Sequence, residues 1–291
     1  MRPYSQFMKI AFLGTGILGY PMAEKLLEHG HELHVYNRTI QKAEGLKEAG
    51  AFLHGKAPEA IQASELIILV LSDANAIEQV LFEKEKILAG KTVIQMGTIA
   101  SSQSRYFLKR VEKLNGEYFE CPVLGSRSEA QEAKLILMAG SSAEQFDRYR
   151  DVLSCFGPAP RHVGEVGQAA RLKLALNQLI AAHASCFSLS LGLIERSGID
   201  TGLFMEILQE SALFAPMYSK KLKNWLAHDY DDPNFPLKHL VKDVVLIAQE
   251  AREAKLNTSI LEAILAVLKK AEKEGLAEKD YSSVYEAINK E

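Results

Sequence analysis

A glycine-rich loop near the start of the chain has the residue types and spacing of a phosphate cradle. It reads Gly-Thr-Gly-Ile-Leu-Gly over residues 14–19, follows an apolar run and opens an amphipathic stretch. In this setting the first glycine permits a tight turn, the second lets the backbone approach a pyrophosphate, and the third lets the helix pack closely on the sheet. Backbone N–H groups at the helix start then bind the phosphates. We predict a dinucleotide site formed by Gly14, Gly16, Ile17, Leu18 and Gly19.

The residues after the next apolar run bear on which dinucleotide is bound. A site for NAD usually has an acidic side chain there, which binds the ribose hydroxyls. This chain has Asn37, Arg38 and Thr39 instead. Arg38 can bind a 2′-phosphate through charge-assisted hydrogen bonds, whereas an acidic side chain would repel it. These residues favour NADP(H); the alternative is that Arg38 is a solvated surface charge.

A lysine and an asparagine share one face of a long apolar stretch in the middle of the chain. Lys173 and Asn177 are four residues apart, so they lie on the same side of a helix. A lysine ammonium beside a carbonyl can polarise it and act as a general acid. The alternative is that Lys173 extends to solvent and Asn177 makes an ordinary polar contact.

Alternating strand and helix patterns position these residues. Predicted strands and helices alternate along the chain, with strands at 9–14, 32–37, 65–71, 92–97 and 135–140 and helices at 18–29, 39–49, 74–82 and 101–115. Continuous apolar runs are typical of strands that are buried on both faces of a parallel sheet. The alternation therefore predicts an α/β fold with a Rossmann-like, doubly wound, mostly parallel sheet.

The pattern changes after residue 167, where helical periodicity dominates and no further strand is predicted. We predict a Rossmann NADP-binding domain over 1–167, in which 1–7 is a disordered extension. An all-helical substrate and dimerisation domain follows over 168–291, beginning with a long interdomain helix from near 168 to 197. Within that helix, 174–194 is uncharged and long enough for a membrane span, but its asparagine, glutamine, histidine and serines suit burial between domains or subunits better.

Charge and the placement of cysteines and histidines bear on possible partners and metal sites. A net charge of −3 gives no reason to expect nucleic acid or a membrane surface as a partner. The three cysteines are far apart and lack metal-ligand spacing, which suits a reducing cytoplasm and predicts no metal site. His29, His31 and His34 span a helix end, a turn and a strand, so we expect their side chains to diverge.

Taken together, these motifs resemble the β-hydroxyacid dehydrogenase family over residues 8–290, particularly the glyoxylate and succinic semialdehyde reductase branch related to 3-hydroxyisobutyrate dehydrogenases. After the cofactor segment, which ends in "VYNRT", three more motifs follow in the family's order. They are "ECPVLGSRSEAQEAKLILMAG" (120–140), "GEVGQAARLKLALNQ" (164–178) and "LVKDVVLIAQE" (240–250). The resemblance implies an enzyme that reduces a small aldehyde acid or 2-keto acid with NADPH.

The resemblance also implies roles for individual residues. Lys173 matches the catalytic lysine, and Asn177 matches the partner that orients it or binds substrate. Gly125 and Ser126 match the turn that holds the substrate carboxylate, but Leu124 stands where the family has a serine. That departure leaves the exact substrate open.

Further matches concern the cofactor. Lys242 matches a residue that reaches the cofactor from the C-terminal domain; the alternative is an ordinary ion pair with its neighbour. Thr98 matches a threonine near the nicotinamide ribose. Leu71 and Ser72, at the end of a predicted strand, should border the adenosine, because ligands bind at the carboxyl ends of such strands.

Three alternatives stay open: a 3-hydroxyisobutyrate-type dehydrogenase, an imine reductase, and a non-catalytic dinucleotide-binding or interaction protein. Imine reductases generally lack the lysine, so Lys173 argues against that assignment. The uncharged helix at 174–194 has more apolar surface than one small domain covers, which predicts a homodimer or homotetramer.

Overall fold

The computed structural model describes residues 7–290, apart from the side chains of residues 85 and 86. The chain forms two compact units, residues 1–173 and 174–291, and each is described here by itself. Most of the segment predicted to be a disordered extension, residues 1–6, lies outside the described residues. Phe7, the first described residue, is 60% exposed.

The first unit is built on a mixed sheet with the strand order β3-β2-β1-β4-β5-β6-β8-β7, in which β9 also pairs with β8. The strands are β1 Lys9–Leu13, β2 Glu32–Tyr36, β3 Phe52–Leu53, β4 Leu66–Leu69, β5 Thr92–Gln95, β6 Glu117–Glu120, β7 Val123–Leu124, β8 Ile136–Gly140 and β9 Arg161–Gly164. Pairing is parallel from β3 through β6, and β8 runs antiparallel to β6.

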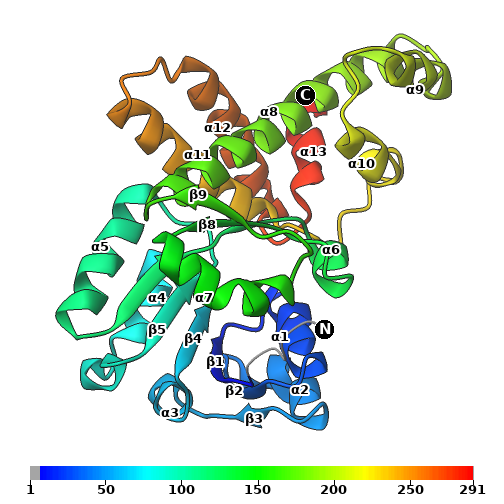
Figure 1. Cartoon of the computed structure of the whole chain (residues 1–291). Helices are drawn as coiled ribbons and strands as arrows, with labels where there is room; N and C mark the ends of the chain where they lie inside the picture. The colour runs from blue at the N-terminus through cyan, green and yellow to red at the C-terminus, as the bar shows by residue number, and fades with distance from the viewer. Residues whose placement is uncertain (1–6, 291) are drawn as a thin grey trace. The chain divides into compact units, whose positions relative to one another are not determined.

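Helices cover both faces of this sheet (Figure 1). They are α1 Gly19–Glu28, α2 Glu44–Glu48, α3 Ala57–Gln62, α4 Ala74–Leu81, α5 Ser101–Lys113, α6 Arg127–Gln131 and α7 Ala143–Ser154. Side chains of α1, α2, α6 and α7 share one apolar cluster, and those of α3, α4 and α5 share another. Along β1, Ile10 and Phe12 join the first cluster, whereas Ala11 and Leu13 join the second. Burial on both faces explains why the central strands are continuously apolar.

Register brings the carboxyl ends of four strands to one edge of the sheet. Leu13, the last residue of β1, pairs with Tyr36 at the end of β2 and with Leu69 at the end of β4. Leu69 in turn pairs with Gln95 at the end of β5. The loops that follow these strands therefore start side by side, although they come from separate parts of the sequence.

Several elements of the first unit were not predicted. β3 and β7 have two residues each, and the residues of β9 are exposed or half-buried, so none of the three produces an apolar run. β6 reads Glu-Tyr-Phe-Glu, and its charged ends interrupt the apolar pattern although its last three residues are buried. The predicted mostly parallel, Rossmann-like arrangement followed by a helical domain is nevertheless confirmed.

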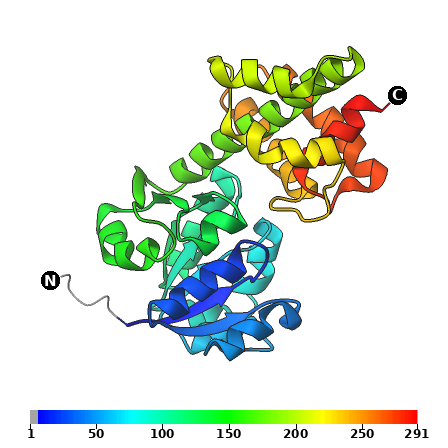
Figure 2. The same ribbon diagram turned by 90° about the vertical axis from the view of Figure 1, so that its right-hand side faces the viewer.

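The second unit is helical, as Figure 2 shows. It contains most of α8 Gln168–Arg196, followed by α9 Thr201–Glu210, α10 Pro216–Ala227, α11 Leu237–Glu253, α12 Ser259–Ala271 and α13 Val284–Asn289. Leu174, Ala181 and Ala184 of α8 pack in one apolar cluster with α11, α12 and α13. Phe187 and Leu191 pack in a second, aromatic cluster with Tyr218 and Trp225 of α10.

Helix α8 also passes a length-and-composition test for a membrane span, within the part of the chain that the structure describes. In its most apolar window the mean hydropathy is 1.3, and 39% of the window is buried. The buried residues of α8 pack in two core clusters, and a single helix of this kind is weak evidence for a membrane span.

Candidate functional site

The glycine loop between β1 and α1 is held by its own backbone and by the next strand. Gly14 has a positive φ of 106°, and its N–H donates to the Tyr36 carbonyl at 3.0 Å. A Cβ at Gly14 would overlap the carbonyl oxygen of Val70, and a Cβ at Gly19 would overlap the carbonyl of Gly14. The fold itself therefore requires these two glycines.

Gly16 differs, because the fold does not require it. It is exposed, its φ lies outside the left-handed region, and a Cβ placed on it would meet no atom within 4 Å. The absence of a side chain at this position keeps space open in front of the loop. A ligand that approaches the backbone closely explains a glycine here, which is what a pyrophosphate needs.

The start of α1 suits an anion as well. Leu18, at the N-cap position, provides no side-chain hydrogen bond to the helix, and the first turn has no acidic residue. The first N–H groups and the positive end of the helix dipole are thus not blocked by the helix's own side chains. The hydroxyl of Thr15 is buried without a hydrogen-bond partner. A dinucleotide phosphate fits this arrangement.

Asn37 fastens the loop to the turn after β2. Its Oδ1 accepts a hydrogen bond from the Thr15 N–H at 3.0 Å, and its Nδ2 donates to the Thr39 carbonyl at 2.7 Å. An aspartate could accept the first bond but could not donate the second. Arg38 and Thr39 are exposed beside it, so the turn after β2 presents a guanidinium group and has no carboxylate at 37–39.

The loops after β4 and β5 lie against each other at the same edge. A Cβ at Gly97 would overlap the carbonyl of Leu71, so the two loops are in close backbone contact. Ser72 is exposed, and its hydroxyl donates to Asp73 Oδ2 at 2.8 Å. Thr98 is half-buried. The structure thus places Leu71, Ser72 and Thr98 at the glycine-loop edge of the sheet, while their contacts with a nucleotide stay predictions.

In the turn predicted to hold a substrate carboxylate, the hydrogen-bond donors of Ser126 are already bonded to another side chain. Ser126 donates to Glu129 Oε2 twice, from its N–H at 2.8 Å and from its hydroxyl at 2.6 Å. Gly125 precedes it with a φ of 135°. Glu129 is not among the predicted site residues, although Ser-x-x-Glu before a helical pattern is a capping signature. A substrate carboxylate at Ser126 would have to displace Glu129.

Lys173 and Asn177 lie one turn apart on α8 and are 7% and 2% exposed. Asn177 Nδ2 donates to Asp243 Oδ2 at 2.6 Å, while Asn177 Oδ1 is buried without a hydrogen-bond partner. Asp243, on α11, is 1% exposed and forms an ion pair with Lys242 at 3.1 Å. Asp243 therefore fixes the orientation of the Asn177 amide, a role the sequence pattern did not reveal. The predicted contact of Lys242 with the cofactor stays a prediction.

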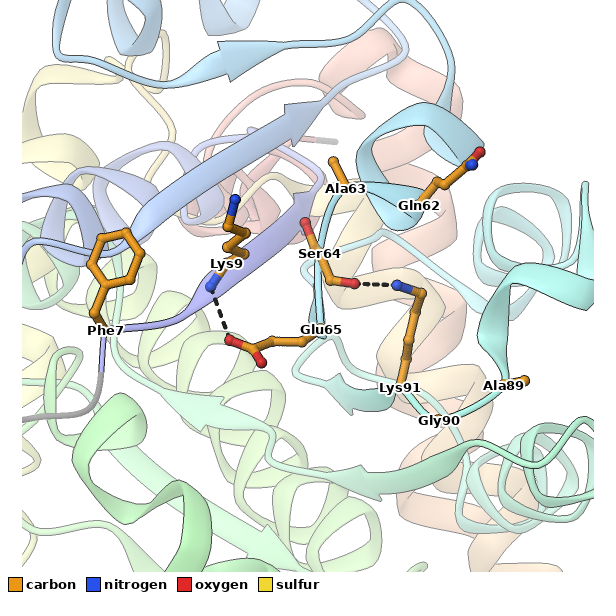
Figure 3. A pocket seen from close by; sticks show the side chains of 9 residues that line it. All are labelled: Phe7, Lys9, Gln62, Ala63, Ser64, Glu65, Ala89, Gly90 and Lys91. Carbon is orange, nitrogen blue, oxygen red and sulfur yellow. Dashed lines mark hydrogen bonds between the residues drawn. The ribbon is translucent and has the colours of Figure 1, made fainter.

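A hollow of about 380 Å³ lies at the opposite edge of the sheet (Figure 3). Its lining includes Lys9, Glu65 and Lys91, which lie at or just before the amino ends of β1, β4 and β5. The Lys9 N–H donates to Glu65 Oε1 at 3.2 Å, and Lys91 Nζ donates to the Ser64 carbonyl. This hollow contains none of the predicted site residues.

The clustered histidines have separate partners. His34 contacts His54 and Glu32 at 3.0 Å each, His29 contacts the Lys25 carbonyl, and His31 lies 3.9 Å from the Cys155 sulfur. Among the described residues no group of three or more His, Cys, Asp or Glu side chains could hold a metal ion.

Replacing Gly16 separates ligand binding from folding. We expect Gly16→Val to weaken dinucleotide binding at least tenfold, because the new side chain fills the space in front of the loop, with little change in melting temperature. Gly55→Val is the control, since its Cβ also meets open space, far along the chain from the loop. Fluorescence titration with NADPH and thermal unfolding measure the two effects. Unchanged NADPH affinity in Gly16→Val would contradict the predicted cradle.

Comparisons with known proteins show the family to which the chain belongs. Two family profiles match: the NAD-binding domain of 6-phosphogluconate dehydrogenase over residues 9–166, and the NAD-binding domain of NADP-dependent 3-hydroxyisobutyrate dehydrogenase over residues 167–288. The chain is 32% identical to glyoxylate/succinic semialdehyde reductase 1 of Arabidopsis thaliana, over 97% of this chain and 98% of that protein. It is 27% identical to 2-hydroxy-3-oxopropionate reductase of Escherichia coli, over 97% of each.

Other relatives are more distant. The chain is 26% identical to the cytokine-like nuclear factor N-PAC of Drosophila melanogaster, over 94% of this chain but only 46% of that protein. A crystal structure of 3-hydroxyisobutyrate dehydrogenase from Salmonella typhimurium superposes with a TM-score of 0.88 at 21% identity, over 97% of this chain and 99% of that one. An imine reductase from Myxococcus stipitatus gives 0.67, also at 21% identity, over 96% and 99%. The chain belongs to the β-hydroxyacid dehydrogenase family of NAD(P)-dependent oxidoreductases, which act on CH–OH groups.

Proposed function

We propose that this protein uses NADPH to reduce a small aldehyde acid or 2-keto acid to the hydroxy acid, with Lys173 as the general acid. The observation that carries the proposal is the pair Lys173 and Asn177, which are buried one turn apart on a helix that is otherwise apolar there. Burying a lysine is costly, so an ammonium at this position calls for a functional explanation.

The chemistry needs two groups. NADPH, when bound, supplies the hydride for the carbonyl carbon. The carbonyl oxygen also needs a proton, which the Lys173 ammonium can donate from Nζ. Asn177 has its Nδ2 committed to Asp243, so its Oδ1 is left as an acceptor that can orient a substrate hydroxyl or a nearby N–H group.

Glycine-loop N–H groups and Arg38 support the choice of NADPH. The helix start can bind the pyrophosphate, and no acidic residue among 37–39 opposes a 2′-phosphate. An exposed guanidinium at residue 38 can donate two hydrogen bonds to such a phosphate.

Relatives guide the choice of substrate. One is named a glyoxylate/succinic semialdehyde reductase and another a 2-hydroxy-3-oxopropionate reductase. The test is to measure the decrease in NADPH absorbance with glyoxylate, succinic semialdehyde and 2-hydroxy-3-oxopropionate as substrates. Methylmalonate semialdehyde is included to detect a 3-hydroxyisobutyrate-type activity. Turnover of none of them would contradict the proposed function and favour the non-catalytic alternative.

We also propose a cytoplasmic location and self-association. Cys121, Cys155 and Cys186 are all free thiols, which suits a reducing compartment. Two helices carry exposed apolar rows: Leu189 and Leu193 on α8 are 65% and 66% exposed, and Leu203 and Ile207 on α9 are 50% and 60% exposed. Exposed apolar rows of this kind are typical of subunit interfaces, which supports a homodimer or homotetramer.

Lys173→Ala should abolish proton delivery without disturbing the cofactor site. We expect kcat to fall by about 10²–10⁴-fold, while the dissociation constant for NADPH stays within about threefold. Lys173→Arg should not restore kcat, because the guanidinium stays protonated and its planar fork does not match the ammonium. Asn177→Ala should cost less and should act mainly on KM. Steady-state kinetics and NADPH titration check these values; a Lys173→Ala enzyme that keeps most of its kcat would reassign the acid.

Arg38→Glu should reverse the cofactor preference. Charge-assisted hydrogen bonds contribute about 1.5–3 kcal/mol, so we expect NADPH to bind roughly ten- to a hundredfold more weakly, with NADH little affected. Lys42→Glu is the control, because it makes the same charge change at an exposed position on the next turn. Competing titrations with the two dinucleotides measure the ratio. If the wild-type protein binds NADH as tightly as NADPH, Arg38 does not select the phosphate.

Self-association should depend on the exposed row of α8. We expect light scattering at micromolar concentration to give at least a dimer mass, and Leu189→Lys with Leu193→Lys to shift the protein toward the monomer. Leu256→Lys is the control, since Leu256 is 64% exposed but lies between α11 and α12. A monomeric wild-type protein would refute self-association.

A further inference from the structure

A buried carboxylate that the proposed reaction does not use lies where α8 begins. Glu120 is the last residue of β6 and is 1% exposed. Its Oε1 accepts hydrogen bonds from the Gly167 N–H at 2.7 Å and from the Ala170 N–H at 2.9 Å. Both donors belong to the first turn of α8 or to the residue just before it. These N–H groups have no acceptor within the helix, because a helix leaves its first four N–H groups unsatisfied.

The sheet makes room for this carboxylate. Gly140, at the end of β8, is the pairing partner of Glu120, and a Cβ at Gly140 would lie 2.6 Å from Glu120 Oε1. Burial raises the pKa of the Glu120 carboxyl, and hydrogen bonding by the Ser104 side chain and by backbone N–H groups opposes that rise. An exposed serine or aspartate at the helix start would satisfy the same N–H groups without the desolvation cost. The buried arrangement therefore does more than cap the helix: it ties the helix start to the sheet.

A second contact restrains the same turn. Arg171 Nη2 donates to the hydroxyl of Ser101, the first residue of α5, at 3.3 Å. Arg105 Nη2 donates to that hydroxyl at 3.2 Å. Glu120 of β6 thus holds the main chain at the start of α8. Ser101 of α5 holds the side chain of Arg171, which lies two residues before Lys173.

We infer that Glu120 is a positioning residue for Lys173: it fixes the first turn of α8 against the sheet and thereby sets where the Lys173 ammonium lies. Ala170 and Lys173 are three residues apart, so the bonded N–H and the lysine belong to the same turn of the helix. Catalytic groups lose rate when they shift by about 1 Å, which makes the attachment of this turn a determinant of kcat. The inference rests on the proposed role of Lys173.

Two substitutions of Glu120 separate positioning from stability. Glu120→Ala removes the acceptor, so we expect kcat per folded protein to fall about ten- to a hundredfold with the NADPH dissociation constant unchanged. Glu120→Gln keeps an acceptor at Oε1 and should retain kcat within about threefold. It should still lower the melting temperature, because its amide hydrogens enter the buried place of Oε2, which lacks a partner. Glu117→Ala is the matched control, since Glu117 begins the same strand and pairs with Arg148 instead.

A double-mutant cycle tests the geometry even if Glu120→Ala folds poorly. Gly140→Ala should push the carboxylate away and lower kcat severalfold in the wild-type background. In the Glu120→Ala background its effect should be clearly smaller, because the contacts with Glu120 are gone and only the approach to the Glu165 carbonyl oxygen, at 3.0 Å, remains. Equal effects of Gly140→Ala in both backgrounds would overturn the proposed link between Gly140 and Glu120.

Two readouts need no substrate and so test Glu120 even if the proposed function fails. Amide hydrogen exchange over residues 167–173 should be faster in Glu120→Ala than in wild type. Reductive methylation of Lys173, which is 7% exposed, should also be severalfold faster. Neither should change in Glu117→Ala. Unchanged exchange and labelling in Glu120→Ala would overturn the inference, as would faster exchange together with a wild-type kcat.

Discussion

Parallel register is the constraint on which the nucleotide-binding edge depends. The pairing of Leu13 with Tyr36 and Leu69, and of Leu69 with Gln95, ends four strands at one level. The glycine loop, the Asn37 turn and the loops at 71–72 and 97–98 all start from those ends. A register slip of one residue would turn every buried side chain to the other face, so two covered faces lock the register firmly. The burial that stabilises the sheet also aligns the loops.

Helix α8 begins in the first unit and continues into the second. Its apolar sequence lets it serve as a core element of the helical unit, and the same burial makes Lys173 and Asn177 expensive to keep there. Asp243 compensates Asn177 by accepting its amide hydrogen. Glu120 compensates the helix start by accepting two main-chain N–H groups. The Asn177 amide and the main chain at the helix start are thus each paired with a carboxylate from another part of the chain.

The turn at 124–126, which the resemblance assigns to the substrate carboxylate, departs from the family pattern. Leu124 lacks the hydroxyl that the resemblance assigns to the carboxylate turn, and Glu129 engages both donors of Ser126. A negative charge already beside that turn disfavours a second carboxylate there, because like charges repel at short distance. Glu129 and Leu124 are therefore the two residues at which a test of substrate choice under the proposed function should begin.

The amino-acid sequence by itself determined the class of fold, the order of the main strands and helices, and the glycine loop. These follow from local periodicity and from the position of the glycines between a predicted strand and a predicted helix. It also paired Lys173 with Asn177, since four-residue spacing on a helix is a local property. Only the tertiary structure decided that Asn37 ties the loop to the next turn, that Asp243 orients Asn177 and that Glu120 holds α8. Each of these joins residues between 22 and 66 positions apart in the chain, and one sequence carries no signal for hydrogen bonds between such distant residues.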